Sequence, residues 1–249
     1  MRRLALSFAA SVLALSPVAV FADEVKDMPT LLATRGKQVL ADDFSSPTMD
    51  AKWKPAKGKW DIKDGALHGV EVASDMHAAA IRTDLKHGNA VYQFDFKFEN
   101  GKVIHLSING AKGHICRVTI SPDGFQVRKD GSKTDTTDKP ALLDSCKMAF
   151  EQGKRYTMVV ECVGNEMIAR VDDAHFAFGS DAKVASEKTN FGFPISGEGS
   201  IDNVRVWEAS ANPDWAKTKE KLTSEHPPKM APAVPARKPA AAAPKGKAK

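Results

Sequence analysis

The stretch Tyr92–Phe98 alternates strictly between aromatic and polar side chains. Successive side chains of a β-strand point to opposite faces, so this alternation predicts a strand with one face in a core and the other toward water. On a helix, the four rings would be scattered around the circumference. The polar face presents Gln93, Asp95 and Lys97. The aromatic face presents Tyr92, Phe94, Phe96 and Phe98.

Shorter alternating runs follow along much of the chain, and Asp-Gly and Asn-Gly pairs, which are typical of tight turns, separate them. We expect about a dozen short strands, with a short helix or irregular segment at 142–150. Little helix lies between the strands, which disfavours a parallel sheet, and no fixed repeat indicates a propeller. The pattern therefore predicts an all-β sandwich or barrel.

The N-terminal residues 1–22 have the features of a secretory signal peptide. Arg2 and Arg3 precede an apolar run, and Ala22 ends a small-residue cleavage site. An uncleaved membrane anchor is the alternative. Cleavage would give a bacterial protein that is periplasmic or secreted, with no integral membrane segment.

The remaining chain divides by composition into a lead-in at 23–38, one domain at 39–210 and a disordered tail at 211–249 that is rich in Pro, Ala and Lys. Of the net charge of +5, residues 217–249 contribute +7 and the signal segment +2, which leaves −4 for residues 23–216. A mildly acidic domain argues against a nucleic-acid partner. The basic tail is either a solvated extension or a contact to an anionic envelope polymer.

Three cysteines are present, and two of them share strand parity with apolar neighbours. Cys116 and Cys162 are therefore predicted to be buried, and a bridge between them would require adjacent strands. The spacing of these two with Cys146 matches no zinc motif.

Several short motifs stand near the two ends of the predicted domain: Asp42-Asp43-Phe44, Trp53, Trp60–Leu67, Asn190–Phe193 and Ser200–Val206. They resemble motifs of the concanavalin A-like lectin and glucanase superfamily, and in particular its 3-keto-disaccharide hydrolase-like branch, long described as a domain of unknown function. The resemblance spans about residues 39–208. It implies a jelly-roll β-sandwich of two curved antiparallel sheets, with the last strand beside the first and glycans held on the concave face.

The same resemblance implies a structural Ca²⁺ near the paired ends of the domain. Asp202 matches a position that often supplies a ligand there, and Asp43 is its expected neighbour. Ordinary turn aspartates are the alternative interpretation. No other cofactor is indicated.

The paired carboxylates of the glucanase relatives are missing from this sequence. Asp95 and Glu99 share a strand face, but their separation of about 13 Å is too large for a pair that acts on one glycosidic bond. Hydrolysis by this strand is therefore disfavoured, and a solvated sheet face is the simpler interpretation.

A second group of polar residues follows from strand parity. His105 and Ser107 share one face of their strand, and Arg117 belongs to the polar face of the next. If the aromatic strand adjoins these two, one surface would combine His105 and Asp95 as catalytic base and acid with residues that bind sugar hydroxyls. Those substrate-binding candidates are Gln93, Lys97, Ser107, Arg117 and His77, which would lie at the rim.

Three functions remain open at this stage. The first is an exported domain that binds a saccharide or cell-envelope glycan on its concave sheet. The second is a glycosidase that cleaves 3-keto-glycosides by base-assisted elimination and hydration, with His105 or Asp95 as the base. The third is a non-catalytic adhesion or scaffold domain of the envelope.

Overall fold

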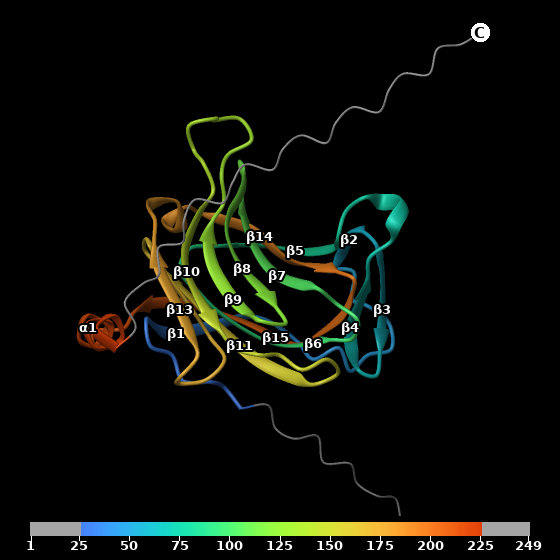
Figure 1. Ribbon diagram of the computed structural model, residues 1–249, viewed down its shortest axis with the longest axis horizontal. Coiled ribbons are helices and arrows are strands. Elements are labelled where there is room, and N and C mark those ends of the chain that lie inside the picture. The colour runs from blue at the N-terminus through green and yellow to red at the C-terminus, as the bar shows by residue number, and fades with distance from the viewer. Residues whose placement is uncertain (1–25, 226–249) are drawn as a thin grey trace, which may run out of the picture.

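The structure is a computed structural model and describes residues 26–225. Two antiparallel sheets pack face to face with a hydrophobic core between them (Figure 1). The predicted all-β sandwich, with two antiparallel sheets of jelly-roll type, is therefore confirmed. Helix is confined in the described residues to two short 3₁₀ turns, η1 (Ala73–Asp75) and η2 (Ala182–Ala185), and to α1 (Trp215–Glu225).

Sheet A has the strand order β13-β12-β11-β6-β15-β4-β3, and β1 pairs with β15 beside this path. Its strands are β1 (Ala33–Asp42), β3 (Lys59–Lys63), β4 (Ala66–Val70), β6 (Ala90–Phe98), β11 (Arg155–Val163), β12 (Glu166–Arg170), β13 (Phe176–Ser180) and β15 (Glu198–Ala211).

Sheet B has the strand order β10-β9-β8-β7-β14-β5-β2. Its strands are β2 (Lys54–Lys57), β5 (Ala79–His87), β7 (Val103–Gly110), β8 (Gly113–Ser121), β9 (Gly124–Lys129), β10 (Ala141–Lys147) and β14 (Lys188–Ser196). The segment expected to be helical or irregular at 142–150 is thus largely the edge strand β10. Its alternation is weak because β10 pairs on one side only in this sheet.

The aromatic strand is β6, and its four rings are buried in the core as the alternation predicts. Phe94 contacts Phe193 of sheet B edge to face, with ring centroids 5.2 Å apart. Phe96 makes a similar contact with Phe150 at 5.2 Å. Such pairs contribute about 1 kcal/mol each beyond the burial of their area. The rings therefore hold the two sheets together.

The first and last strands of the domain pair as the resemblance implies. In β1 and β15, Asp42 lies opposite Val204 and Ala33 lies opposite Ala211. This pairing begins six residues before Val39, inside the predicted lead-in, so the boundary at residue 38 is wrong. The alternation of β1 is weak because most of its side chains are exposed or half-buried.

The residues before β1 also depart from the prediction, because they cover the outer face of sheet A. Backbone N–H groups of Leu31 and Ala33 donate to the carboxylate of Glu161, at 3.0 Å and 2.8 Å to its Oε2. Arg170 donates to the carbonyl of Pro29. The polar face of β6 and β11 is therefore partly buried under this segment rather than open to water.

The predicted start of the disordered tail, at residue 211, lies too early in the chain. β15 continues to Ala211, and α1 follows directly. Trp215 is buried against Phe178, with ring centroids 5.4 Å apart, and its indole N–H donates to Glu166 Oε2 at 2.8 Å. The signal segment 1–22 and the tail beyond residue 225 lie outside the described residues. Within residues 26–225, no helix has the length and apolar character needed to cross a membrane.

Candidate functional site

The predicted polar surface divides between the two sheets. β6 pairs with β11 and β15 in sheet A, whereas β7 pairs with β8 and β14 in sheet B. The expected adjacency of β6 to β7 and β8 is therefore wrong. His105, Ser107 and Arg117 come together as predicted, but Asp95 and the other polar residues of β6 lie on the opposite side of the sandwich.

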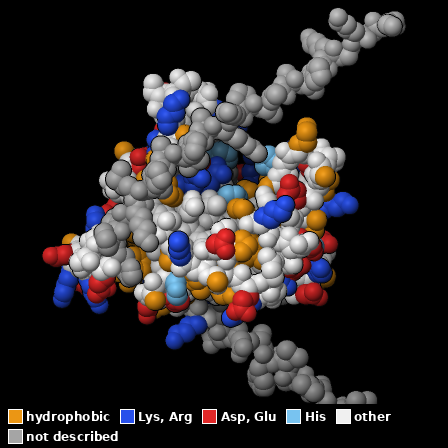
Figure 2. Space-filling view, in the orientation of Figure 1, with side chains coloured by type: hydrophobic (Ala, Val, Ile, Leu, Met, Phe, Trp, Pro, Cys, Tyr) orange, Lys and Arg blue, Asp and Glu red, His pale blue; other side chains and the backbone are white. Residues whose placement is uncertain are grey.

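The sheet B group lines a hollow in the outer face of β5, β14, β7 and β8. Its volume is about 280 Å³. Figure 2 shows this hollow as a recess in which Lys or Arg and His side chains gather. Its lining residues are Ala56, His77, Ala78, Ala80, Ile81, Arg82, His105, Ser107, Asn109, His114, Arg117, Gly192 and Pro194.

The floor of the hollow is formed by small residues in register. Gly192 of β14 lies opposite Ser107 of β7. Only glycine fits at position 192, because a Cβ there would lie 2.1 Å from the carbonyl oxygen of Ile81. The Ser107 side chain is 3% exposed, and its hydroxyl has no hydrogen-bond partner among residues 26–225. A buried hydroxyl without a partner is costly, so this atom requires a ligand or water in the hollow.

His105 lies beside Ser107 on the same face of β7. Its Nδ1 is 3.1 Å from the hydroxyl of Thr119. Burial, together with the positive charge of Arg117, lowers the pKa of His105 to about 4. The imidazole is therefore neutral at neutral pH. Arg117 is itself held by Asp130, with 2.8 Å between Nε and Oδ2.

Two further histidines reach the hollow from its rim. His77 is exposed, and its Nδ1 lies 2.7 Å from the carbonyl oxygen of Ala78. His114 lies with Nδ1 2.5 Å from the side-chain oxygen of Asn109. Burial and the charge of Arg117 lower the pKa of His114. The rim thus offers imidazoles and an amide, which suit sugar hydroxyls.

The predicted binding and catalytic residues of β6 make structural contacts in sheet A. Gln93 is fully buried, and its Oε1 accepts a hydrogen bond of 2.8 Å from the backbone N–H of Met28. Asp95 accepts hydrogen bonds from Thr157, at 2.5 Å, and from Asn203, at 2.8 Å. With its lone pairs engaged, Asp95 is not placed to act on a ligand of the hollow.

The two aspartates proposed for calcium do not converge. Asp202 is paired with Arg155, which neutralises its carboxylate. Asp43 lines a separate depression with Asn203 and Arg205, and its Oδ1 accepts the N–H of Ser45 at 3.1 Å. Arg155 already balances Asp202, and in the described residues neither aspartate belongs to a group of three or more His, Cys, Asp or Glu side chains that could share a cation, so these residues do not fit a structural Ca²⁺.

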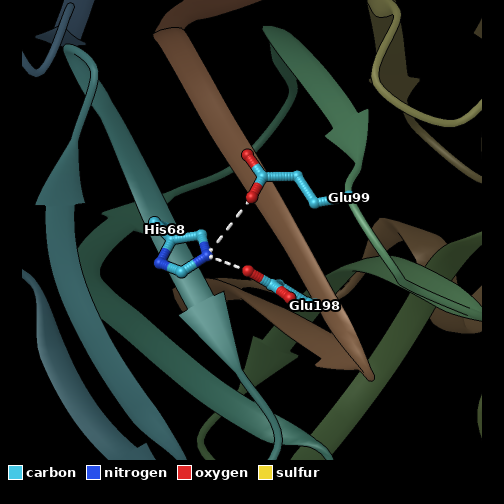
Figure 3. A group of neighbouring side chains, drawn as sticks. All are labelled: His68, Glu99 and Glu198. Carbon is cyan, nitrogen blue, oxygen red and sulfur yellow. Dashed lines mark hydrogen bonds and ion pairs between the residues drawn. The ribbon is translucent and has the colours of Figure 1, made fainter.

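A different cluster, which the sequence did not indicate, joins His68, Glu99 and Glu198 (Figure 3). His68 lies on β4, and its Nε2 is 2.9 Å from Glu198 Oε1 and 3.4 Å from Glu99 Oε2. Its Nδ1 is 2.9 Å from Asp61 Oδ1. In the described part of the chain, this is the set whose donor atoms lie close enough together to hold a cation. The sequence did not indicate it because β15 must pair with both β4 and β6 to bring the three residues together.

Basic side chains already balance this cluster. Burial raises the pKa of Glu99, but hydrogen bonds from Lys97, at 2.8 Å, and from Ser200, at 2.6 Å, outweigh it and lower the pKa to about 2. Lys63 lies 3.7 Å from the same carboxylate. We therefore assign the cluster to an ion-pair network that ties the end of β6 to β4 and β15. Lys97, a predicted binding residue, belongs to this network.

Comparisons with known proteins extend this description. No protein-family model and no curated protein matches the chain. A carbohydrate-binding module of type CBM66 from Bacillus subtilis shares the fold, with 16% identity, a TM-score of 0.53 and coverage of 65% of this chain and all of that one. A protein of unknown function with a galectin-like fold from Bacillus subtilis has 12% identity and a TM-score of 0.56, with coverage of 73% of this chain and 100% of that one. The laminarinase from Rhodothermus marinus has 11% identity and a TM-score of 0.51, with coverage of 72% of this chain and 99% of that one.

These similarities establish the architecture. The chain has a jelly-roll sandwich like those of carbohydrate-binding modules and glycosidases, which is the fold that the resemblance implies. At 11–16% identity, these similarities do not transfer a site, since a fold of this kind hosts many functions. A function for the chain must therefore be inferred from the hollow of sheet B.

Proposed function

We propose that this protein is an exported carbohydrate-associated domain that binds a saccharide in the hollow of sheet B. The observation that carries the proposal is the unpaired, buried hydroxyl of Ser107 at the floor of a hollow of about 280 Å³. A cavity of this size with a few converging polar groups is typical of small-ligand sites. Export follows from the signal-like segment 1–22, and a periplasmic or secreted location would bring the domain to envelope glycans.

The lining has the mixture of groups that sugar hydroxyls need. Guanidinium groups donate, histidines and the Asn109 amide both donate and accept, and apolar surface from Pro194 and Ala80 can contact the ring. Sheet A offers no equivalent at its central strands, because the segment before β1 covers Gln93 and Glu161.

A glycan array with the full chain tests the proposal. We expect binding to at least one saccharide class, and Ser107→Leu, which fills the floor, should weaken it about tenfold or more. Lys59→Gln, on the edge strand β3 of sheet A, is the matched control and should bind normally. A chain that is folded by circular dichroism but binds no glycan would contradict the proposal, and if it also fails to cleave 3-keto-glycosides, an adhesion or scaffold role would remain.

A second candidate is cleavage of 3-keto-glycosides, and the neutral His105 in the hollow favours it. A ketone at C3 acidifies the C2–H bond, so a base at His105 can remove that proton. The released electron pair forms the C1=C2 bond as the glycosidic C1–O bond breaks, and the leaving oxygen takes a proton. Water then adds across the double bond. Asp95, the other base considered, lies in sheet A.

Turnover of 3-keto-disaccharides measures this second candidate directly. His105→Gln should reduce kcat by about 100-fold or more and leave binding of the unoxidised disaccharide within about threefold. If the wild-type chain binds saccharides but releases no product from the oxidised ones, the domain is a binding module.

A further inference from the structure

The hollow of sheet B contains a row of residues that runs straight across four strands. Arg82 of β5 lies opposite Gly192 of β14, Gly192 opposite Ser107 of β7, and Ser107 opposite Arg117 of β8. Neighbouring strands are about 4.8 Å apart, so the two arginine backbones are separated by about 14 Å. Two small residues fill the space between them. A long guanidinium side chain thus rises on each side of a low floor.

The charge of this row is unbalanced. Arg82 is exposed and makes no hydrogen bond or ion pair within residues 26–225. Its charge interacts with that of Asp84 on the same strand, but the Asp84 carboxylate is paired directly with Lys54 at 2.5 Å. The described lining of the hollow includes no Asp or Glu. Asp130, beneath it, offsets Arg117 alone.

The row continues in the same direction onto β9. Arg128 lies opposite Arg117 in register, and its Nε is buried without a partner in the described structure. The charges of Arg117 and Arg128 both contribute, after burial, to the low pKa of His105. The hollow is therefore strongly basic, although residues 23–216 as a whole carry −4.

From this geometry we infer that the hollow selects an acidic saccharide, a sugar ring that carries a carboxylate or sulfate group. The inference rests on the proposed function and names its ligand class. The guanidinium of Arg82 or Arg117 binds the anionic group, for which its planar fork is suited. The hydroxyl of Ser107 then pairs with a ring hydroxyl at the floor. A neutral sugar would leave Arg82 without an anionic partner in the hollow.

Binding should be measured by calorimetry with matched oligosaccharides on the full chain. Oligogalacturonate, oligoguluronate and a glucuronate-containing oligosaccharide are each compared with their methyl esters, which keep the ring and remove the charge. Sulfated oligosaccharides form a second arm and neutral glucans a third. We expect at least one acidic ligand to bind, at least tenfold more tightly than its neutral counterpart, and the first two arms identify which anionic group is selected.

Two variants link this preference to the row. Arg82→Gln should weaken the acidic ligand about tenfold and reduce the dependence of affinity on salt, without loss of stability, because Arg82 is exposed and unpaired. Ser107→Ala should weaken binding while the fold is as stable as wild type or more so, because an unpaired buried hydroxyl is removed. Lys59→Gln changes the net charge equally and should have no effect.

The outcomes separate the two proposals. Equal binding of esters and acids, or wild-type affinity in Arg82→Gln, overturns the inference and leaves saccharide binding intact. No binding of any sugar by the folded chain overturns both.

Discussion

The backbone N–H of Met28 donates a hydrogen bond of 2.8 Å to the side-chain Oε1 of Gln93, 65 residues further along the chain. The Nε2 of the same amide donates to the carbonyl of Lys26 at 3.1 Å. Both halves of a fully buried amide are thus used to hold the segment before β1. Gln93, which the alternation of β6 predicts as a solvent-facing residue, is instead an anchor for that segment.

Glu161 should be the strongest anchor of this segment. Its carboxylate is fully buried and accepts hydrogen bonds from Leu31 and Ala33. Glu161→Gln keeps the size but turns a donor toward these donors, so we expect a loss of about 1–3 kcal/mol in the free energy of unfolding. Urea denaturation followed by circular dichroism measures it. Glu220→Gln, at an exposed position of α1, is the control; an equal effect of both variants would show that the anchor is not needed.

The sequence predicts which side of each strand is apolar, because that depends on local alternation. Tyr92, Phe94 and Phe96 are therefore correctly placed in the core. It does not predict which sheet a strand joins. The pair Asn100-Gly101 between β6 and β7 is typical of a hairpin, yet it connects sheet A to sheet B. The prediction of one surface that combines β6 with β7 is wrong because of this single connection.

The same dependence on sheet topology determines which residues of the hollow the sequence predicts. Ser107 and Arg117 follow from parity on strands that are consecutive in the chain and paired. Arg82 and Gly192 do not, since β14 inserts between β5 and β7 from a distant part of the sequence. The guanidinium of Arg82 can therefore be placed in the hollow only once the position of β14 is known.

The pH dependence of stability should reveal the buried His105. Its pKa in the folded chain is about 4, below the ordinary value of 6.5, so only the unfolded chain takes up the proton between these values. Stability should therefore fall by about 3 kcal/mol as the pH decreases from 6.5 to 4, and the contribution of this group should level off below pH 4. Urea denaturation at a series of pH values measures the slope.

The matching variants are His105→Gln, which should flatten this part of the profile, and His77→Gln, at an exposed position, which should not. If the profile of His105→Gln keeps the full slope, the imidazole is not the group that titrates.

Glu99 should add a pH dependence of the same sign as His105, but in a lower pH range. Its folded pKa of about 2 lies below the ordinary 4.5, so its stabilisation is complete above pH 4.5 and is lost as the pH falls toward 2. Solvent reaches the side chain and screens the ion pairs, so Glu99→Gln should cost about 1 kcal/mol at pH 7 and nothing at pH 2. Thermal unfolding at both pH values measures the difference.

The same experiment tests the assignment of the His68 cluster. With Lys97 and Lys63 already beside its carboxylates, we expect added Zn²⁺ or Mn²⁺ to shift the Tm by less than about 2 °C. A larger shift that disappears in Glu99→Gln would establish a cation site in place of the ion-pair network.

Cys116 and Cys162 face each other across the core, on β8 of sheet B and β11 of sheet A. A hydrogen bond between the two thiols, with burial, raises the pKa of Cys116. Adjacent strands are therefore not needed for the two residues to meet. Both thiols are reduced in the structure, and an oxidising compartment would join them, closing a loop of about 45 residues and stabilising the fold by about 4 kcal/mol. Mass spectrometry of the non-reduced chain, digested and alkylated under denaturing conditions, should show this bridge after expression with export. Cys116→Ala with Cys162→Ala should then remove the sensitivity of the Tm to reductant, and a wild-type Tm that reductant leaves unchanged would contradict the bridge.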